Sequence, residues 1–184
     1  MSEQPDVVEL LKQQHRQIRE LLDEVGDSKD ADRADAFHRL VRLLAVHETA
    51  EEEVVHPYAR RHIDGGDQVV GERIEEEERA KVVLSELASL DTGAPEFHDR
   101  FIALRQDVLA HADAEERMEF AQLRHTTDQR GLETLARAVK AAEALAPTRP
   151  HPGTDTAAKN LAAGPVAAVI DRTRDAVRKV MGTS

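Results

Sequence analysis

The sequence predicts an all-α protein: an up-down four-helix bundle with an additional helix and a C-terminal amphipathic helix. Ala, Leu, Glu and Arg are abundant among the 184 residues, Trp is absent, and only four Phe and one Tyr occur, which is the composition of packed helices. Apolar residues recur at steps of three and four through most of the chain. The breaks between these periodic segments are short, and helices joined by short loops pack antiparallel, so the segments should form one bundle.

The first helix is expected from about Pro5 to Val25, with Gly26 ending it. Its apolar line consists of residues three or four apart, namely Val8, Leu11, His15, Ile18 and Leu22. His15 should therefore lie in the buried stripe of this helix, among the side chains of the core.

The second helix follows the polar residues 26–32 and is expected to reach about Arg61. His47 and Glu51 lie on its apolar stripe, four residues apart. Pro57 should bend the last turn of this helix.

Two further long helices and a shorter one are expected in the rest of the bundle. The third helix follows the break at residues 65–67 and should run to about Leu90. A turn at residues 91–95 leads into the fourth helix, which should end near His125. The apolar pattern then restarts, and residues 127–146 should form a fifth helix that covers the bundle.

The bundle also predicts which residues share a level along its axis. Counted from the loops at ~1.5 Å per residue, the inward-facing positions of the four long helices fall at a common level within about one turn. These positions are His15, His47, Glu77 and His111. We therefore expect their side chains to meet inside the bundle.

The chain should be organised as a bundle at residues 1–146, a linker at 147–164 and an amphipathic helix at 165–184. The linker holds three prolines within six residues, which cannot continue a helix. Everything from Pro147 onward carries six Lys or Arg against three Asp, a net charge of +3, so the rest of the chain carries −14. The tail helix is expected to dock on this acidic bundle, in the same or a neighbouring subunit. The alternative is a protein partner or a membrane surface.

Composition excludes several classes of protein. The chain has no Cys, so any metal must be held by nitrogen and oxygen atoms, which favours iron or manganese and also admits zinc. A formal charge of −11 argues against a basic surface that binds nucleic acid. No apolar run approaches the ~20 residues of a membrane span, and the first residues do not resemble a signal peptide. The expected location is cytoplasmic.

Two His-x-x-x-Glu pairs carry the chemistry of the sequence, His47 with Glu51 and His111 with Glu115. A gap of four puts an imidazole and a carboxylate on one helix face, about 6 Å apart at the backbone, where both can reach one metal ion. A single such pair in a chain that is one-third charged would usually be a half-buried histidine beside a surface glutamate. The second copy, at the same level of the bundle, favours two metals.

Four segments of this chain resemble the hemerythrin-like proteins that have a His-His-Glu cation-binding domain: Asp6–His15, His47–Pro57, Glu75–Lys81 and His111–Glu116. The likeness covers roughly residues 5–125, and the segments are separated by the length of a bundle helix. The tail resembles, more weakly, the C-terminal extensions of actinobacterial members of this family.

The resemblance implies a site for two iron ions, joined by oxo and carboxylate bridges, inside the bundle. Position by position, it implies metal ligands at His15, at His47 with Glu51, and at His111 with Glu115. It also implies small reactants, namely oxygen, peroxide or nitric oxide.

This chain departs from the family on the third helix, where the family has a histidine and this sequence has the acidic run Glu75–Glu78. At about 100° per residue, Glu77 falls about 20° from Leu84 and faces inward, which makes it the candidate ligand of this helix. His56, near the end of the second helix, is the other candidate, and whether Glu77 or His56 completes the site stays open. Glu116 is an alternative to its neighbour Glu115 as the bridging carboxylate.

A glutamate in place of a histidine adds negative charge to the site, and negative charge stabilises ferric iron. Together with the resemblance, this predicts a di-iron protein that binds or reacts with oxygen or peroxide in an oxidative-stress or redox role, rather than a reversible oxygen carrier. Whether it is an enzyme stays open, and peroxide decomposition is the activity that would fit. The alternative is an iron-holding protein, or a metal-dependent sensor or regulator that acts through a partner.

Overall fold

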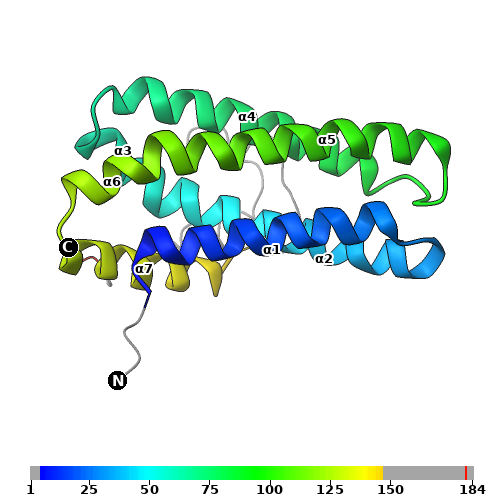
Figure 1. Ribbon diagram of the computed structural model, residues 1–184, viewed down its shortest axis with the longest axis horizontal. Helices are drawn as coiled ribbons and strands as arrows, with labels where there is room; N and C mark the ends of the chain where they lie inside the picture. Colours follow the sequence, from blue (N-terminus) through cyan, green and yellow to red (C-terminus); the bar gives the residue numbers. More distant parts are fainter. Residues whose placement is uncertain (1–4, 147–180, 182–184) are drawn as a thin grey trace, which may run out of the picture.

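The computed structural model describes residues 5–146 and Met181. Within these residues the chain forms helices and no strand, so the predicted all-α fold and the predicted fifth helix are confirmed (Figure 1). Two of the elements, η1 and η2, are single π-helical turns. The elements in chain order are α1 (Val7–Asp27), α2 (Asp30–Ala50), η1 (Glu51–Val55), α3 (His56–His62), α4 (Gly66–Leu87), α5 (Pro95–Ala114), η2 (Glu115–Glu119), α6 (Phe120–Thr126) and α7 (Gln129–Glu143).

Two helical hairpins make up the bundle. α1 pairs with α2 and α4 pairs with α5, and the loops of both hairpins lie at the same end of the molecule (Figure 1). The short helices α3 and α6 lie at the opposite end. α7 packs against α1, α2 and η1, so the additional helix covers one side of the bundle.

α1 begins two residues later than expected because Asp6 is its N-cap. The Asp6 carboxylate accepts a hydrogen bond from the Glu9 N–H at 2.9 Å, which satisfies one of the free donors of the first turn. The helix ends at Asp27, so Gly26 lies inside its last turn rather than after it. The His15 side chain is buried, as its place on the apolar line predicts.

A π turn interrupts each of the second and fourth predicted helices. In η1 the His56 N–H donates to the Glu51 carbonyl five residues back, and in η2 the Phe120 N–H donates to the Glu115 carbonyl. The departure from α-helical geometry therefore starts at Glu51, before Pro57. Because η2 forms without a proline, the two π turns do not share proline as their cause.

The apolar core consists of two clusters with the polar site residues between them. The first cluster is built from the start of α1 and from η1, α3, α6 and α7, and the second from the end of α1 and from α2, α5 and the end of α4. Along the four long helical segments, the residue that falls between the clusters is His15, His47, Glu77 or His111. The buried polar side chains are thus packed between apolar side chains on both sides along the bundle axis.

Most of the predicted tail lies outside the described residues. The linker at 147–164 and the helix at 165–184 belong to that part, except for Met181, which is half-buried against the first cluster. The division of the chain at residues 146 and 164 therefore stays a prediction. In the part of the chain that the structure describes, none of the helices is both long and apolar enough to cross a membrane.

The turn between α3 and α4 depends on two adjacent glycines. Gly65 has a φ of +65°, a left-handed conformation that glycine adopts without strain. A Cβ atom on Gly66 would lie 2.7 Å from the Arg60 carbonyl oxygen and 2.8 Å from that of Ala59. The backbone of α3 therefore approaches α4 too closely for any side chain at position 66.

Gly66→Ala should destabilise the protein by about 1–3 kcal/mol, because the methyl group would collide with backbone atoms that cannot move independently. Gly71→Ala, inside α4 with nothing near its added Cβ, is the matched control and should stabilise by about 0.5–1 kcal/mol through helix propensity. Denaturant unfolding followed by circular dichroism measures both changes. Equal stability of the two variants would contradict the close contact.

Candidate metal centre

The two π turns begin at the glutamates of the two His-x-x-x-Glu pairs. Glu51 starts η1 four residues after His47, and Glu115 starts η2 four residues after His111. Both carboxylates are completely buried. Single π turns inside α-helices are frequent at functional sites, where they redirect side chains. The repeat in the sequence is therefore also a repeat in the backbone.

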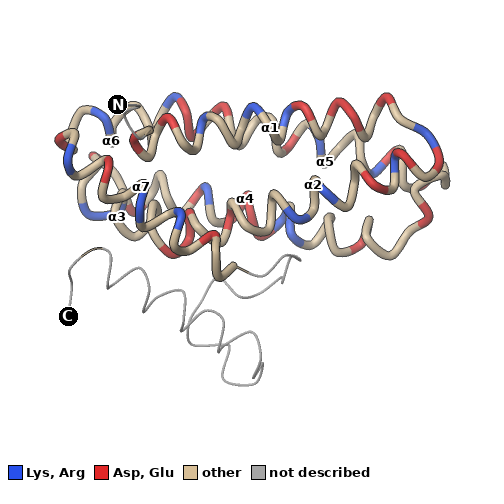
Figure 2. The backbone as a smooth tube through the Cα atoms, turned by 90° about the horizontal axis from the view of Figure 1, so that it is seen from below, with Lys and Arg blue, Asp and Glu red and all other residues tan. Residues whose placement is uncertain are grey.

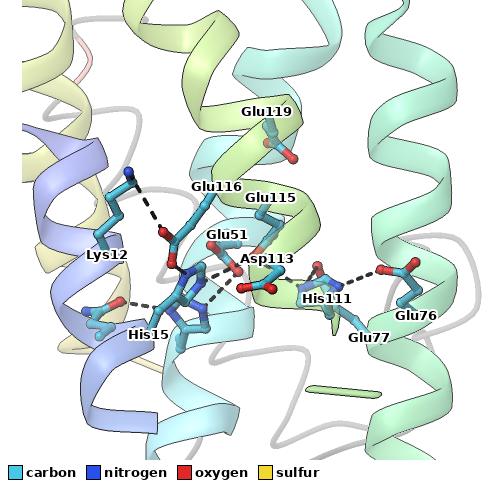
Figure 3. A network of polar contacts seen from close by, with 12 residues as sticks. Lys12, His15, Glu51, Glu76, Glu77, His111, Asp113, Glu115, Glu116 and Glu119 are labelled. Atoms are coloured by element: carbon cyan, nitrogen blue, oxygen red, sulfur yellow. Dashed lines mark hydrogen bonds and ion pairs between the residues drawn. The ribbon is translucent and has the colours of Figure 1, made fainter. Parts of the chain in front are cut away.

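Candidate ligand atoms gather in two overlapping groups, and within each group they all lie within 4.8 Å of one another. The first group contains two imidazoles, from His15 and His47, with the carboxylates of Glu51 and Glu115. The second group contains one imidazole with three carboxylates: His111, Glu51, Glu77 and Glu115. Glu51 and Glu115 belong to both groups and lie between the helices in Figure 3. These two carboxylates therefore join the two groups into one cluster of candidate ligands.

Each of the three imidazoles is held from the outside through Nδ1. The acceptors come from neighbouring helices and are two carboxylates and one amide oxygen. The pairs are His15 with Glu116 at 3.0 Å, His47 with Gln14 at 2.8 Å, and His111 with Glu76 at 2.9 Å. A proton on Nδ1 leaves the lone pair on Nε2, which is how metal-binding histidines are commonly oriented.

The Nε2 atoms of the same imidazoles face the shared carboxylates. His15 Nε2 lies 3.3 Å from Glu115, and His111 Nε2 lies 3.4 Å from the same residue. His47 Nε2 lies 3.3 Å from Glu51. Imidazole nitrogens from α1, α2 and α5 thus converge with carboxylate oxygens from η1 and η2 (Figure 3).

Several of these buried atoms have no hydrogen-bond partner among the described residues. They are Nε2 of His15 and His111, both carboxylate oxygens of Glu51 and of Glu115, and one oxygen of Glu77. A buried polar atom without a partner costs roughly 1–3 kcal/mol, more if it is charged. These lone pairs are donors that a bound cation would satisfy, so the donor set fits a metal centre.

A comparison with known protein families agrees with this geometry. The family model described as the hemerythrin HHE cation binding domain matches residues 6–123. The chain belongs to the hemerythrin HHE family. This HHE domain is therefore a metal-binding protein, as its buried His and Glu residues indicate.

Two individual proteins are similar to this HHE domain. The crystal structure of an HHE cation binding domain-containing protein from Mycobacterium kansasii has a TM-score of 0.68 and 21% identity, and the match covers 92% of this chain and 99% of that one. This likeness shows the fold. A DNA nickase from Nostoc is 29% identical over 139 residues, which are 75% of this chain and 39% of the nickase. The HHE domain thus spans about two-fifths of that relative's length.

Glu77 and His56, the two candidates to complete the second group, contact each other. His56 Nε2 lies 2.6 Å from Glu77, and its Nδ1 lies 3.2 Å from Glu119. Both ring nitrogens of His56 are therefore engaged by carboxylates. Glu77 keeps one oxygen without a partner among the described residues and lies with Glu51 in the second group, whereas His56 lies in a further group with Glu115.

Three further glutamates have places that the helical pattern alone did not assign. Glu119 is completely buried and forms a third, smaller group of ligand atoms with His56 and Glu115. From the sequence, Glu119 and His56 are the candidates to exchange protons near the centre, and Glu119 lies four residues after Glu115. Glu116 binds the outer nitrogen of an imidazole rather than replacing its neighbour in the two groups, and Glu76 does the same on the other side.

Burial and crowding shift the pKa values of the site. Burial raises the pKa of Glu51 well above its ordinary value, and the nearby Glu115 carboxylate adds to this. Burial by itself lowers the pKa of His111. The nearby carboxylates, with Glu115 first among them, raise it by more, so the pKa of His111 lies well above its ordinary value. Burial lowers the pKa of His47 to about 3. Because metal ligands bind in their deprotonated form, protons compete with a metal more strongly at Glu51 and His111 than at His47.

Other buried charged side chains, which are not candidate ligands, lie beside the centre. Lys81 forms an ion pair with Glu52, and both side chains are largely buried. Burial raises the pKa of Glu48 to about 8, although the positive charge of nearby Lys81 partly opposes this rise. Lys81 lies one helical turn beyond Glu77 on α4, so a fixed positive charge adjoins the more acidic half of the centre.

One hollow borders the candidate ligands, and a second borders His56 and Glu52 nearby. A small, mostly apolar pocket of about 20 Å³ is bordered by the three candidate ligand imidazoles and by aliphatic side chains, including Ile18, Leu44 and Val108. A larger and more polar cavity of about 600 Å³ is bordered by Glu52, His56, Arg60, Arg61 and Asp67. The first hollow has room for about one water-sized molecule.

His47→Ala should lower the number of metal ions bound per chain, because it removes a lone pair of the first group. His38→Ala is the matched control, since His38 is an exposed histidine of the same helix. Elemental analysis after anaerobic loading with ferrous iron compares the two variants. If both bind as much metal as the unaltered protein, His47 is not a ligand.

Proposed function

We propose that this HHE domain holds two iron ions and binds or reacts with oxygen or peroxide. The observation that carries the proposal is the pair of ligand groups that share Glu51 and Glu115. His15 and His47 would complete the ligands of one ion, and Glu77 with His111 those of the other. Iron bound there supplies the redox chemistry, because imidazoles and carboxylates do not change oxidation state themselves.

The donor types support iron as the metal. The proposed ligands are three imidazoles and three carboxylates, and the sequence has no thiolate to offer. Imidazole nitrogen suits iron and zinc, whereas carboxylate oxygen suits manganese and iron, so a mixed set matches iron best. Manganese and zinc are the alternatives that metal analysis distinguishes.

Three buried carboxylates favour the more highly charged state of the metals. Each carboxylate at the centre offsets one positive charge, and Glu77 provides one more than a histidine at that position would. The extra negative charge stabilises ferric relative to ferrous iron. A centre that prefers the ferric state is poorly suited to releasing oxygen unchanged, so we favour a reaction with oxygen or peroxide over reversible oxygen carriage.

The protein around the centre selects small reactants. The side chains of Glu51, Glu77 and Glu115 are no more than 1% exposed, so only a molecule that enters through a narrow opening can reach them. The apolar pocket beside the imidazoles would admit a diatomic molecule and exclude bulk water. On the other side, His56 and Glu119 are hydrogen-bonded next to Glu77 and are placed to hold a proton near a reactant.

The buried centre of this HHE domain is poorly suited to DNA, the substrate in the name of the Nostoc relative. A DNA phosphodiester is too bulky to reach carboxylates that are buried inside the bundle. Basic and acidic residues are interspersed along the described helices (Figure 2), and the whole chain carries a net charge of −11. A polyanion such as DNA would find little attraction there.

Anaerobic loading with ferrous iron, followed by elemental analysis and absorption spectra before and after peroxide or oxygen, tests the proposal. We expect two iron ions per chain and new absorption bands on oxidation. One iron ion or none per chain would contradict the shared-carboxylate centre. Two iron ions with no spectral response would favour the alternative, an iron-holding or sensory protein that acts through a partner, with the C-terminal segment as the proposed contact.

Glu77→His should raise the reduction potential of the iron, because it replaces a negative ligand with a neutral one while keeping a donor. Glu77→Gln should weaken the binding of ferric iron more than that of ferrous iron, for the same loss of charge. Redox titration of the iron-loaded variants, followed by absorption, measures the potential.

Glu75→Gln is the control for the Glu77 variants, because Glu75 is exposed on the same helix. Glu76 would be a poor control: its carboxylate holds Nδ1 of His111, so changing it should disturb the centre as well. An unchanged potential in Glu77→His, together with loss of metal in His56→Ala, would move the ligand from α4 to α3.

A further inference from the structure

Among the described candidate ligands, His47 is the one imidazole whose Nδ1 is held by an amide. Its Nδ1 lies 2.8 Å from Oε1 of Gln14, a residue of α1 that is only 8% exposed. The other two candidate ligand imidazoles are held by carboxylates. This difference matters because an ionised carboxylate can only accept a hydrogen bond, whereas an amide can accept or donate.

The orientation of the Gln14 amide decides which nitrogen of His47 is free. With its oxygen toward the ring, the amide accepts from an Nδ1–H, and the lone pair is on Nε2, facing Glu51. With its NH2 group toward the ring, the amide would donate to a bare Nδ1, and the proton would reside on Nε2. In that second tautomer Nε2 has no lone pair for a metal.

Glu143 fixes this orientation from outside the bundle. The Nε2 atom of Gln14 donates a hydrogen bond to the Glu143 carboxylate, which stands at the last residue of α7. Since a carboxylate presents no donor, only the NH2 end of the amide can face it, and the oxygen end is left for His47. Burial raises the pKa of Glu143, and the hydrogen bond from Gln14 opposes that shift by favouring the ionised form.

We propose that Glu143 is a positioning residue of the metal centre: from the additional helix α7 it orients the Gln14 amide and thereby selects the metal-binding tautomer of His47. The purpose of this arrangement rests on the proposed function. The tautomer itself is a property of the metal-free protein, so it can be measured whether or not iron proves to be the ligand.

Nitrogen-15 NMR of the histidine rings in the full-length, metal-free protein tests the proposal. His47 should carry its proton on Nδ1 in the unaltered protein and become a mixture of both tautomers in Glu143→Leu. Glu133→Leu is the matched control, because Glu133 is a half-buried glutamate of α7 whose hydrogen-bond partner among the described residues is Gln129. After anaerobic loading with ferrous iron, loss of iron to a chelator should be about 10-fold faster in Glu143→Leu than in the control.

A swapped pair separates positioning from a general effect on folding. In Gln14→Glu with Glu143→Gln, the new carboxylate at position 14 accepts from both the ring and the new amide, so the Nδ1–H tautomer should return. Should Glu143→Leu fail to fold, Glu143→Gln takes its place, since its amide can face Gln14 by either end and should also give a mixture. A His47 ring that keeps its Nδ1 proton in these single variants, or a swap that does not restore it, overturns the proposal. Absence of iron binding by the unaltered protein would contradict the proposed function instead, and the tautomer would still decide this inference.

Discussion

The burial of two carboxylates, Glu51 and Glu115, between two apolar clusters is the constraint on which the rest of the structure depends. Moving a carboxylate out of water costs several kcal/mol unless opposite charge and hydrogen bonds compensate. Here the surrounding imidazoles turn Nε2 toward these oxygens, and their outer nitrogens are held by residues of neighbouring helices. Bound cations would supply the positive charge that these buried carboxylates require, in agreement with the cation-binding family to which the chain belongs.

The fold and the inward faces could be predicted because they follow from the helical period. His15 and Glu77 are buried where the steps of three and four put them, and the two His-x-x-x-Glu pairs meet at one level because the bundle is antiparallel with short loops. The π turns could not be predicted, since they depend on a shift of the backbone hydrogen bonds by one residue. No feature of the composition signals that shift in this chain, because neither turn contains a proline and Pro57 follows only the first of them.

The outer partners of the imidazoles were also beyond prediction, for a different reason. His15 and Glu116 are 101 residues apart in the chain, and His47 and Gln14 are 33 apart. Helical periodicity says which face a residue occupies but not which residue of another helix lies opposite. The pairing of Glu76 with His111 shows the limit clearly, because the period puts Glu76 away from the centre, and its role comes from a neighbouring helix.

The two π turns change which face of the helix the residues after them occupy. Each inserts one residue beyond the α-helical repeat, so the helix that follows is rotated by about 100° relative to an uninterrupted one. η1 and η2 lie at the same level of the bundle. The inward-facing positions of α3 and α6 are therefore both shifted by one residue relative to the helical repeat of α2 and α5. One end can therefore keep a regular helical core while the other presents His56 and Glu119 to the centre, and a one-residue deletion in either turn would remove the extra residue while leaving the residues after it on the faces that they now occupy.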